Sequence, residues 1–186
     1  MVRILLGLLL CLGPASAATL EGATLPDSYR LGGQVLSLNG LGLRTLTIFH
    51  VHVYVAGLYV ARRSHDAQEI LASSSPKVLL LQFLHSGSQE QVQRQFRNGE
   101  VVNCGGGGCN PDDEADFNRM VATAPAVNVG DTFTFELTQQ GVRFYWNNRL
   151  LAQSVKPDLG RLILLGFIGS RPPSEELREH LLGATG

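Results

Sequence analysis

Three features are scarce in this sequence, and each scarcity excludes a class of protein. The 186 residues include only three cysteines. Basic residues are not in excess, with 15 Lys and Arg against 16 Asp and Glu. No apolar run reaches the roughly 20 residues that span a membrane. Because the charge is balanced, no basic stripe can hold a phosphate backbone, and we expect no nucleic-acid partner. Glycine and proline are abundant, at 21 and 8 residues, and favour turns, which argues against an all-helical architecture.

The first 17 residues carry the pattern of a secretory signal peptide. A positive charge at Arg3 precedes the apolar run Ile4–Leu12, and Ala15, Ser16 and Ala17 form a small-residue cleavage site. The apolar run is too short for a retained anchor. We therefore expect a signal peptide over residues 1–17 and one mature domain over residues 18–186, periplasmic or secreted, with no transmembrane anchor after cleavage.

Two cysteines remain in the predicted mature chain, Cys104 and Cys109, and they flank four glycines. In an oxidising compartment such a pair is expected to form a disulfide that closes a small loop. Half of a metal site is the alternative, although zinc sites usually pair cysteines two to four residues apart and add a second pair or histidines. The glycines also lack the Gly-Lys-Ser/Thr ending of a phosphate-binding loop.

Strand patterns occupy much of the mature chain. Residues 34–61 are apolar or alternating and rich in β-branched and aromatic residues, and residues 77–84 form an apolar run of strand length. Apolar and polar residues then alternate over 132–137 and 142–146, with turn-forming residues at 139–141 and 147–148. The later segments predict a three-stranded meander that ends near Ser154.

Four helices are predicted between and after these strands, each beginning near a residue that can cap its first turn. The predicted starts are Ser88, Asn110, Asp158 and Ser174. Gly99 is expected to end the first helix, and Gly169 to end the third. The fold class is therefore α+β, an antiparallel sheet with helices packed on one face.

Arg44 and Tyr54 are the most unusual residues of the apolar segment 34–61. A guanidinium at the end of an apolar slot offers a fork of donors to one carboxylate or phenolate. A strand-end arginine with its head in water explains the same residue, and a core tyrosine with one hydrogen bond explains Tyr54. The two could share a face along one continuous strand or lie opposite each other across a reversal of the chain. The sequence leaves both geometries open.

Three histidines form a weaker candidate site. His50 and His52 are two residues apart, which places both on one face of a strand, and His85 on the neighbouring strand could complete a metal site. Histidines that line a polar sheet face without a metal are the more common case. We expect no metal and no other cofactor.

Six segments of the chain resemble the chalcone isomerase-like family, in particular its exported bacterial branch. The matching segments are Leu38–Arg44, Val53–Val60, Phe144–Asn148, Leu165–Gly169, Ser174–Leu177 and Leu181–Gly183. Their order and spacing cover nearly the whole mature chain, from about Leu20 to Gly183. The resemblance implies an open-faced β-sandwich, with an antiparallel sheet, helices on one face and a ligand cleft between them.

The same resemblance implies one of two activities. The family's enzymes close a chalcone into a flavanone with an arginine, which Arg44 matches, and with hydroxyl side chains that polarise the ketone. Tyr54 stands in place of one hydroxyl residue, a threonine, Gly166 stands in place of another, and residues 112–121 contain no match for a helix tyrosine. Non-catalytic relatives bind fatty acids with the same arginine and a tyrosine at the position of Tyr54.

We therefore expect an exported, non-catalytic protein that holds a small amphipathic acid, such as a fatty acid, by its carboxylate. Its tail should lie along apolar side chains of the sheet and the third helix, namely Leu79, Leu81, Phe83, Leu162 and Phe167. Two alternatives stay open. One is a chalcone isomerase-type intramolecular lyase that acts on a phenolic enone, and the other is a structural or interaction module without a ligand.

The signal peptide prediction is checked by mass. Protein purified from the exported fraction should begin at Ala18, because cleavage follows the small-residue site. Intact mass spectrometry distinguishes this terminus from Met1, and an exported chain that retains Met1 would contradict cleavage.

Overall fold

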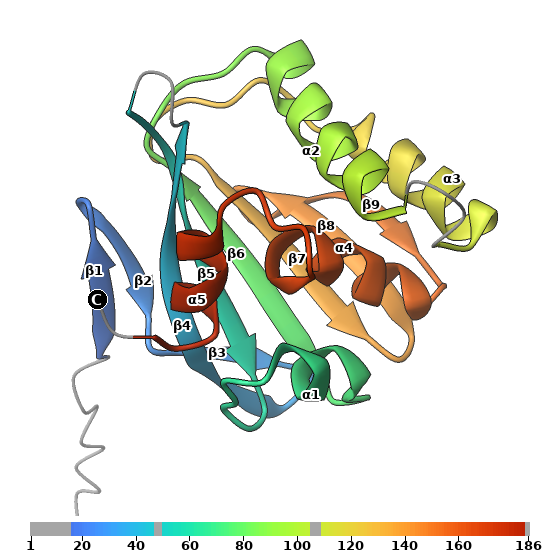
Figure 1. The fold of residues 1–186 in the computed structure, drawn as a ribbon, viewed down its shortest axis with the longest axis horizontal. Coiled ribbons are helices and arrows are strands. Elements are labelled where there is room, and N and C mark those ends of the chain that lie inside the picture. Colours follow the sequence, from blue (N-terminus) through green and yellow to red (C-terminus); the bar gives the residue numbers. More distant parts are fainter. Residues whose placement is uncertain (1–15, 47–49, 105–108, 185–186) are drawn as a thin grey trace, which may run out of the picture.

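The computed structural model describes residues 16–46, 50–104 and 109–184, without the side chains of residues 100 and 101. Most of the predicted signal peptide and the four glycines at 105–108 therefore lie outside the described residues. The main feature is a seven-stranded antiparallel sheet with the order β3-β4-β5-β6-β7-β8-β9, accompanied by a separate β1–β2 hairpin (Figure 1). The strands are β1 Ala17–Leu20, β2 Ala23–Pro26, β3 Ser28–Leu31, β4 Gln34–Leu46, β5 Val51–Val60, β6 Lys77–Phe83, β7 Thr132–Thr138, β8 Gly141–Trp146 and β9 Arg149–Ser154.

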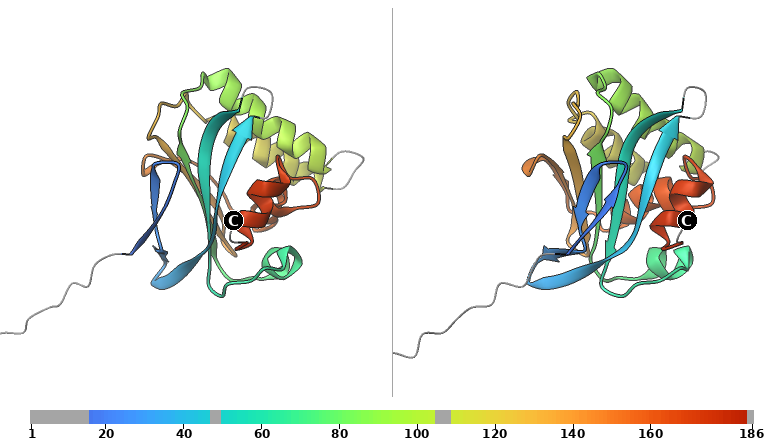
Figure 2. Two further views of the ribbon diagram at one scale, coloured as in Figure 1. Left: turned by 60° about the vertical axis from the view of Figure 1, so that its left-hand side comes forward. Right: turned by 90° about the vertical axis from the view of Figure 1, so that its left-hand side faces the viewer.

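The helices in the described part of the chain cover one face of this curled sheet. They are α1 Ala67–Ala72, α2 Gln89–Cys104, α3 Pro111–Val121, α4 Asp158–Ile168 and α5 Glu175–Leu181. Figure 2 shows the helices on one side of the sheet and the β1–β2 hairpin on the other. The predicted α+β architecture is confirmed.

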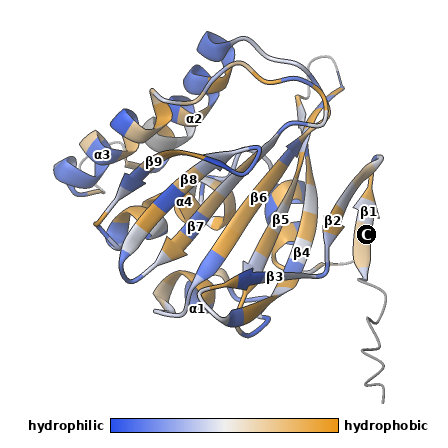
Figure 3. Cartoon of the chain, turned by 180° about the vertical axis from the view of Figure 1, so that it is seen from behind, coloured by the Kyte–Doolittle hydropathy of each residue, from blue (hydrophilic) through white to orange (hydrophobic). Residues whose placement is uncertain are grey.

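Alternation along the strands decides which side chains meet the helices. On β5, Tyr54 and Leu58 belong to the large core beneath the helices, whereas Val55 and Tyr59 face the other way. Val55 packs with Leu25 of the β1–β2 hairpin, which was not predicted from the sequence. Viewed from that side, strands β4 to β6 are mainly hydrophobic, while β7 and β8 mix hydrophobic and hydrophilic residues (Figure 3).

Segment 34–61 forms two antiparallel strands, β4 and β5, so the chain reverses between Arg44 and Tyr54. These two residues are direct partners in the register. Side chains directly opposite each other in an antiparallel pair lie on the same face of the sheet. Of the two geometries that the sequence left open, the structure therefore has the cross-strand one. It turns both side chains toward the helices.

The predicted meander is confirmed as β7–β8–β9, with Asn147 and Asn148 both at positive φ in the second turn. Three of the four predicted helix caps are also confirmed. Ser88 and Gln91 form a reciprocal capping box, while Asn110 and Ser174 accept hydrogen bonds from the first turns of α3 and α5.

Two helix boundaries were predicted wrongly. Helix α2 continues past Gly99 to Cys104, because Gly99 keeps helical conformation; the Gly99 carbonyl also accepts a hydrogen bond from the side-chain amide of Asn103 (2.9 Å). Asp158 does not cap α4. It lies inside the first turn, after Pro157, where its charge still favours the positive end of the helix dipole.

Cys104 and Cys109 form the predicted disulfide. It joins the last residue of α2 to the residue that precedes the Asn110 cap of α3. The two helices that form one side of the helical layer are thereby cross-linked.

Close contact between β4 and α5 depends on glycine. A Cβ atom placed on Gly40 would lie 1.9 Å from the His180 carbonyl oxygen, and one on Gly42 would lie 2.8 Å from the Leu177 carbonyl oxygen and side chain. Asn39 adds a hydrogen bond of 2.8 Å to the Leu181 carbonyl. Helix α5 therefore docks on backbone, and this docking closes the end of the core beside Arg44.

Gly40→Ala should destabilise the protein, because the new methyl group would clash with helix backbone that cannot move as a side chain can. We expect a loss of about 1–3 kcal/mol in the free energy of unfolding, measured by urea denaturation. Ser37→Ala in the same strand is the control and should have a small effect. Equal stability of the Gly40 variant and the control would contradict close β4–α5 packing.

Candidate functional site

A cavity of about 450 Å³ lies between the sheet and helices α2, α3 and α4. This volume is within the range of sites that bind small molecules. Its apolar walls come from strands β5 and β6, the loop before β7, and the three helices. They comprise Val53, Phe83, Val92, Phe96, Phe117, Val127, Leu162, Ile163 and Phe167.

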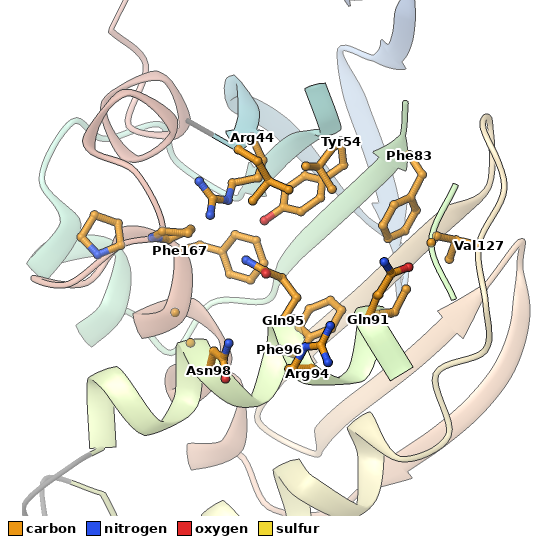
Figure 4. Close-up of a pocket in the computed structure, with 18 of the residues that line it drawn as sticks. Arg44, Tyr54, Phe83, Gln91, Arg94, Gln95, Phe96, Asn98, Val127 and Phe167 are labelled. Carbon is orange, nitrogen blue, oxygen red and sulfur yellow. The ribbon is translucent and has the colours of Figure 1, made fainter. Parts of the chain in front are cut away.

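Arg44 and Tyr54 place their polar groups side by side in this cavity (Figure 4). One guanidinium nitrogen of Arg44, Nη1, donates to the Thr45 carbonyl at 2.8 Å. The Arg44 Nε atom is buried and has no hydrogen-bond partner among the described residues. A buried donor without a partner is costly, so the site is short of one acceptor.

Tyr54 is held rigidly by aromatic neighbours. The residue is 6% exposed, and its ring packs edge-on against Phe83 and tilted against Phe167, with ring centroids 5.9 Å and 6.5 Å away. Burial raises the pKa of the Tyr54 hydroxyl well above its usual value near 10, while the positive charge of Arg44 partly opposes this shift. The hydroxyl therefore remains protonated at neutral pH and can donate a hydrogen bond.

The charges around the cavity favour an anion. Arg44, Arg94 and Arg171 line it, and the described lining residues include no aspartate or glutamate. Arg94 is paired with Glu90 at 3.1 Å, and Arg171 donates to the Val102 carbonyl at 3.0 Å. Neither Arg44 nor Arg171 has an acidic partner within the described chain, so both charges are available to an anionic ligand, and Arg44 is the one beside Tyr54.

Five of the seven residues predicted to contact a ligand line this cavity, namely Arg44, Tyr54, Phe83, Leu162 and Phe167. The structure corrects the placement of Leu79 and Leu81, which are fully buried in the core and do not line the cavity. They share the inward face of β6 with Phe83, but they lie nearer the start of the strand, paired with Phe135 and Phe133 of β7. Alternation along β6 predicted which face of the sheet Leu79 and Leu81 occupy. It could not predict how far along the strand the cavity extends.

Helix α2 contributes lining residues that the sequence analysis did not identify. Gln91, Gln95, Asn98 and Val102 recur at spacings of four, three and four and all line the cavity. Gln95 reaches from α2 toward the space occupied by Arg44 and Tyr54 (Figure 4). Their helical spacing was the available signal, but three of the four carry polar amides, which do not by themselves indicate the wall of a cavity.

The three histidines are not brought together. His50 lies just before β5 with a positive φ, so the strand spacing does not apply to it. His52 pairs with Glu21 at 3.2 Å, while His85 lines the cavity. In the described residues, the one cluster with metal-ligating atoms is Cys104, Cys109 and Glu114, where both sulfurs already form the disulfide. The structure therefore does not assemble either of the predicted alternative metal sites.

Comparison with known families agrees with this architecture. The sequence pattern described as chalcone isomerase-like matches residues 17–183. The chain belongs to the chalcone isomerase-like family. A search of curated proteins finds no matching relative.

Among solved structures, a fatty-acid binding protein from Arabidopsis thaliana has a similar fold. It is 16% identical, with a TM-score of 0.68 over 90% of this chain and 96% of that chain. At this level of identity the likeness establishes the shared fold. No helix in the described residues combines the length and the apolar character needed to cross a membrane.

The raised pKa of Tyr54 predicts an alkaline loss of stability. Because its folded-state pKa exceeds the unfolded value of about 10, the stabilisation is complete below pH 10 and is lost as pH rises toward the folded-state pKa. Between pH 9 and 11, the free energy of unfolding measured in urea should fall less steeply with pH for Tyr54→Phe than for wild type. The slopes should differ by up to about 1.4 kcal/mol per pH unit.

Burial also raises the pKa values of Tyr29 and Tyr59. The loss of stability that these two tyrosines cause at alkaline pH should therefore remain in the Tyr54→Phe variant. Identical slopes for wild type and Tyr54→Phe would contradict the burial of Tyr54.

Proposed function

We propose that this protein binds a small amphipathic acid, such as a fatty acid, and does not catalyse a reaction on it. The observation that supports this proposal most directly is that Arg44 and Tyr54 lie together in one cavity with apolar walls. A carboxylate between them would accept hydrogen bonds from the guanidinium and from the neutral tyrosine hydroxyl. It would also supply the acceptor that the Arg44 Nε lacks among the described residues.

The remainder of the cavity suits the apolar part of such a ligand. Phenylalanines from the sheet and from three helices provide surface that water solvates poorly. The structural neighbour described as a fatty-acid binding protein has the same fold, which supports the proposal without identifying the ligand of this chain.

The isomerase alternative receives less support from the cavity. Its chemistry needs donors placed where charge develops on a ketone oxygen. Gly166 lines the cavity without a side chain at the position where the family's enzymes carry a hydroxyl. Tyr54 is the one hydroxyl beside Arg44 among the labelled lining residues (Figure 4).

We further propose that the protein works outside the cytoplasm. The support is the signal peptide pattern over residues 1–17 together with the Cys104–Cys109 disulfide. Structural disulfides persist in oxidising compartments and are rare where glutathione and thioredoxin keep thiols reduced. A binding protein for an apolar acid in that compartment would keep the acid soluble in transit.

Binding of palmitic acid tests the proposed clamp. Arg44→Ala should weaken binding by about 1.5–3 kcal/mol, the range for a hydrogen bond to a charged group, and Tyr54→Phe by about 0.5–1.5 kcal/mol. Isothermal titration calorimetry measures both.

Arg94→Ala is the control, because that arginine lines the same cavity but is already paired with Glu90. Unchanged affinity in Arg44→Ala would contradict the clamp. Wild-type protein that binds no acid but accelerates the cyclisation of a chalcone would replace the proposed function with the isomerase.

A further inference from the structure

The Arg44–Tyr54 pair lies part-way along the cavity, not at its end. Helix α2 runs along the cavity, and Figure 4 shows its lining residues from Gln91 on one side to Asn98, which lies level with Arg44. Val102 also lines the cavity and lies one turn beyond Asn98, about 6 Å further along the helix axis. The cavity therefore extends past Arg44 on the side away from Gln91.

The side of the cavity near the start of α2 suits the tail of the proposed ligand. Its walls include Phe83, Val92 and Val127, which are all buried. Figure 4 shows the Phe83 and Val127 side chains on the far side of Tyr54 from Arg44. An acid whose carboxylate lies at Arg44 and Tyr54 therefore has apolar surface for its chain in this direction, and it leaves the other side of the cavity unfilled.

That other side carries a second arginine. Arg171 lines the cavity there, since its guanidinium donates to the Val102 carbonyl at 3.0 Å. The backbone of Arg171 is also held in place, because the Asn103 side chain donates to its carbonyl at 3.1 Å. The described lining residues include no aspartate or glutamate. A second positive charge therefore lies on this side without an acidic partner among the described residues.

The same side has room for a ligand group. Gly99 of α2 and Gly166 of α4 line the cavity, and a Cβ atom built on either one meets no described heavy atom within 4 Å. Gly166 precedes Phe167, whose ring packs against Tyr54, so this free space adjoins the proposed carboxylate position. The exposed amide of Asn98 lines the cavity at the same level. Free space, a neutral hydrogen-bonding group and a positive charge thus occur together beside the head of the ligand.

We propose that the site takes acyl compounds whose head carries two anionic groups, one bound by Arg44 and Tyr54 and the other by Arg171. This inference rests on the proposed function and narrows its ligand class. A simple fatty acid has one negative charge, so it neutralises one of the two arginines. A head that continues past the first carboxylate fills the second side and brings another anion to Arg171. The ligand is therefore an acyl chain on a dicarboxylate head, such as an acylated acidic amino acid.

Two matched ligands isolate the second charge. N-lauroyl-L-glutamate has two carboxylates, whereas N-lauroyl-L-glutamine has the same chain and nearly the same shape, with an amide in place of the second carboxylate. Isothermal titration calorimetry on the mature protein at neutral pH should show at least about fivefold tighter binding of the glutamate ligand, because a charged hydrogen bond in a partly enclosed cavity is stronger than an exposed ion pair.

Variants assign this preference to Arg171. Arg171→Gln removes the charge and should bring the two affinities within about twofold of each other. The glutamine ligand should bind this variant as it binds wild type, which shows that the cavity is intact. Arg171→Lys keeps the charge and should keep a preference for the glutamate ligand. Arg94→Gln is the control, because Arg94 lines the same cavity but is paired with Glu90 at 3.1 Å, and it should keep the wild-type preference.

The outcomes separate this inference from the proposed function. Equal affinity of wild type for the two ligands would overturn the inference while acid binding stands, and so would a preference that survives in Arg171→Gln or disappears equally in Arg94→Gln. Wild type that binds lauric acid but neither of the longer heads would have the same meaning. Wild type that binds none of the three compounds would overturn the proposed function as well.

Discussion

The site depends on the register of one antiparallel pair. Arg44 and Tyr54 are direct partners across β4 and β5, which fixes their side chains on the same face and within reach of one ligand group. A slip of one residue would turn one of them to the opposite face, where the β1–β2 hairpin packs. Strand β5 is packed on both faces, because Val55 on the outer face and Leu58 on the inner face are both completely buried.

The helices pack around this strand pair and fix the other walls of the site. The glycines of β4 allow the closest of these contacts. Helix α5 packs directly on Gly40 and Gly42, and α4 presents Phe167 to the Tyr54 ring. Helix α2 then lies along the other side of the cavity, cross-linked to the start of α3 by the disulfide. The cavity is therefore a gap between well-packed elements, and its shape follows from contacts that lie outside it.

Arg44 gives the site a positive charge that no acidic side chain of the described residues pairs with. Elsewhere the arginines in the described chain often pair with carboxylates, as Arg143 does with the largely buried Glu136. Arg44 has a neutral tyrosine beside it instead, and burial keeps that tyrosine protonated. Arg44 is half-buried and its Nε atom has no hydrogen-bond partner among the described residues, so an anion would complete the site, which is the physical basis for an acid as the ligand.

Much of this protein could be read from local patterns. Alternation and turn residues predicted the β7–β8–β9 meander, capping residues predicted three helix starts, and the Cys104–Cys109 spacing predicted the disulfide, because these features depend on neighbours in sequence. Long-range packing decided the rest. It placed Tyr54 opposite Arg44, carried α2 through Gly99, and buried Leu79 and Leu81 away from the cavity that Phe83 reaches. Sequence periodicity gives the face of a side chain, but only the positions of the helices above the sheet determine where that face meets a cavity and where it meets the core.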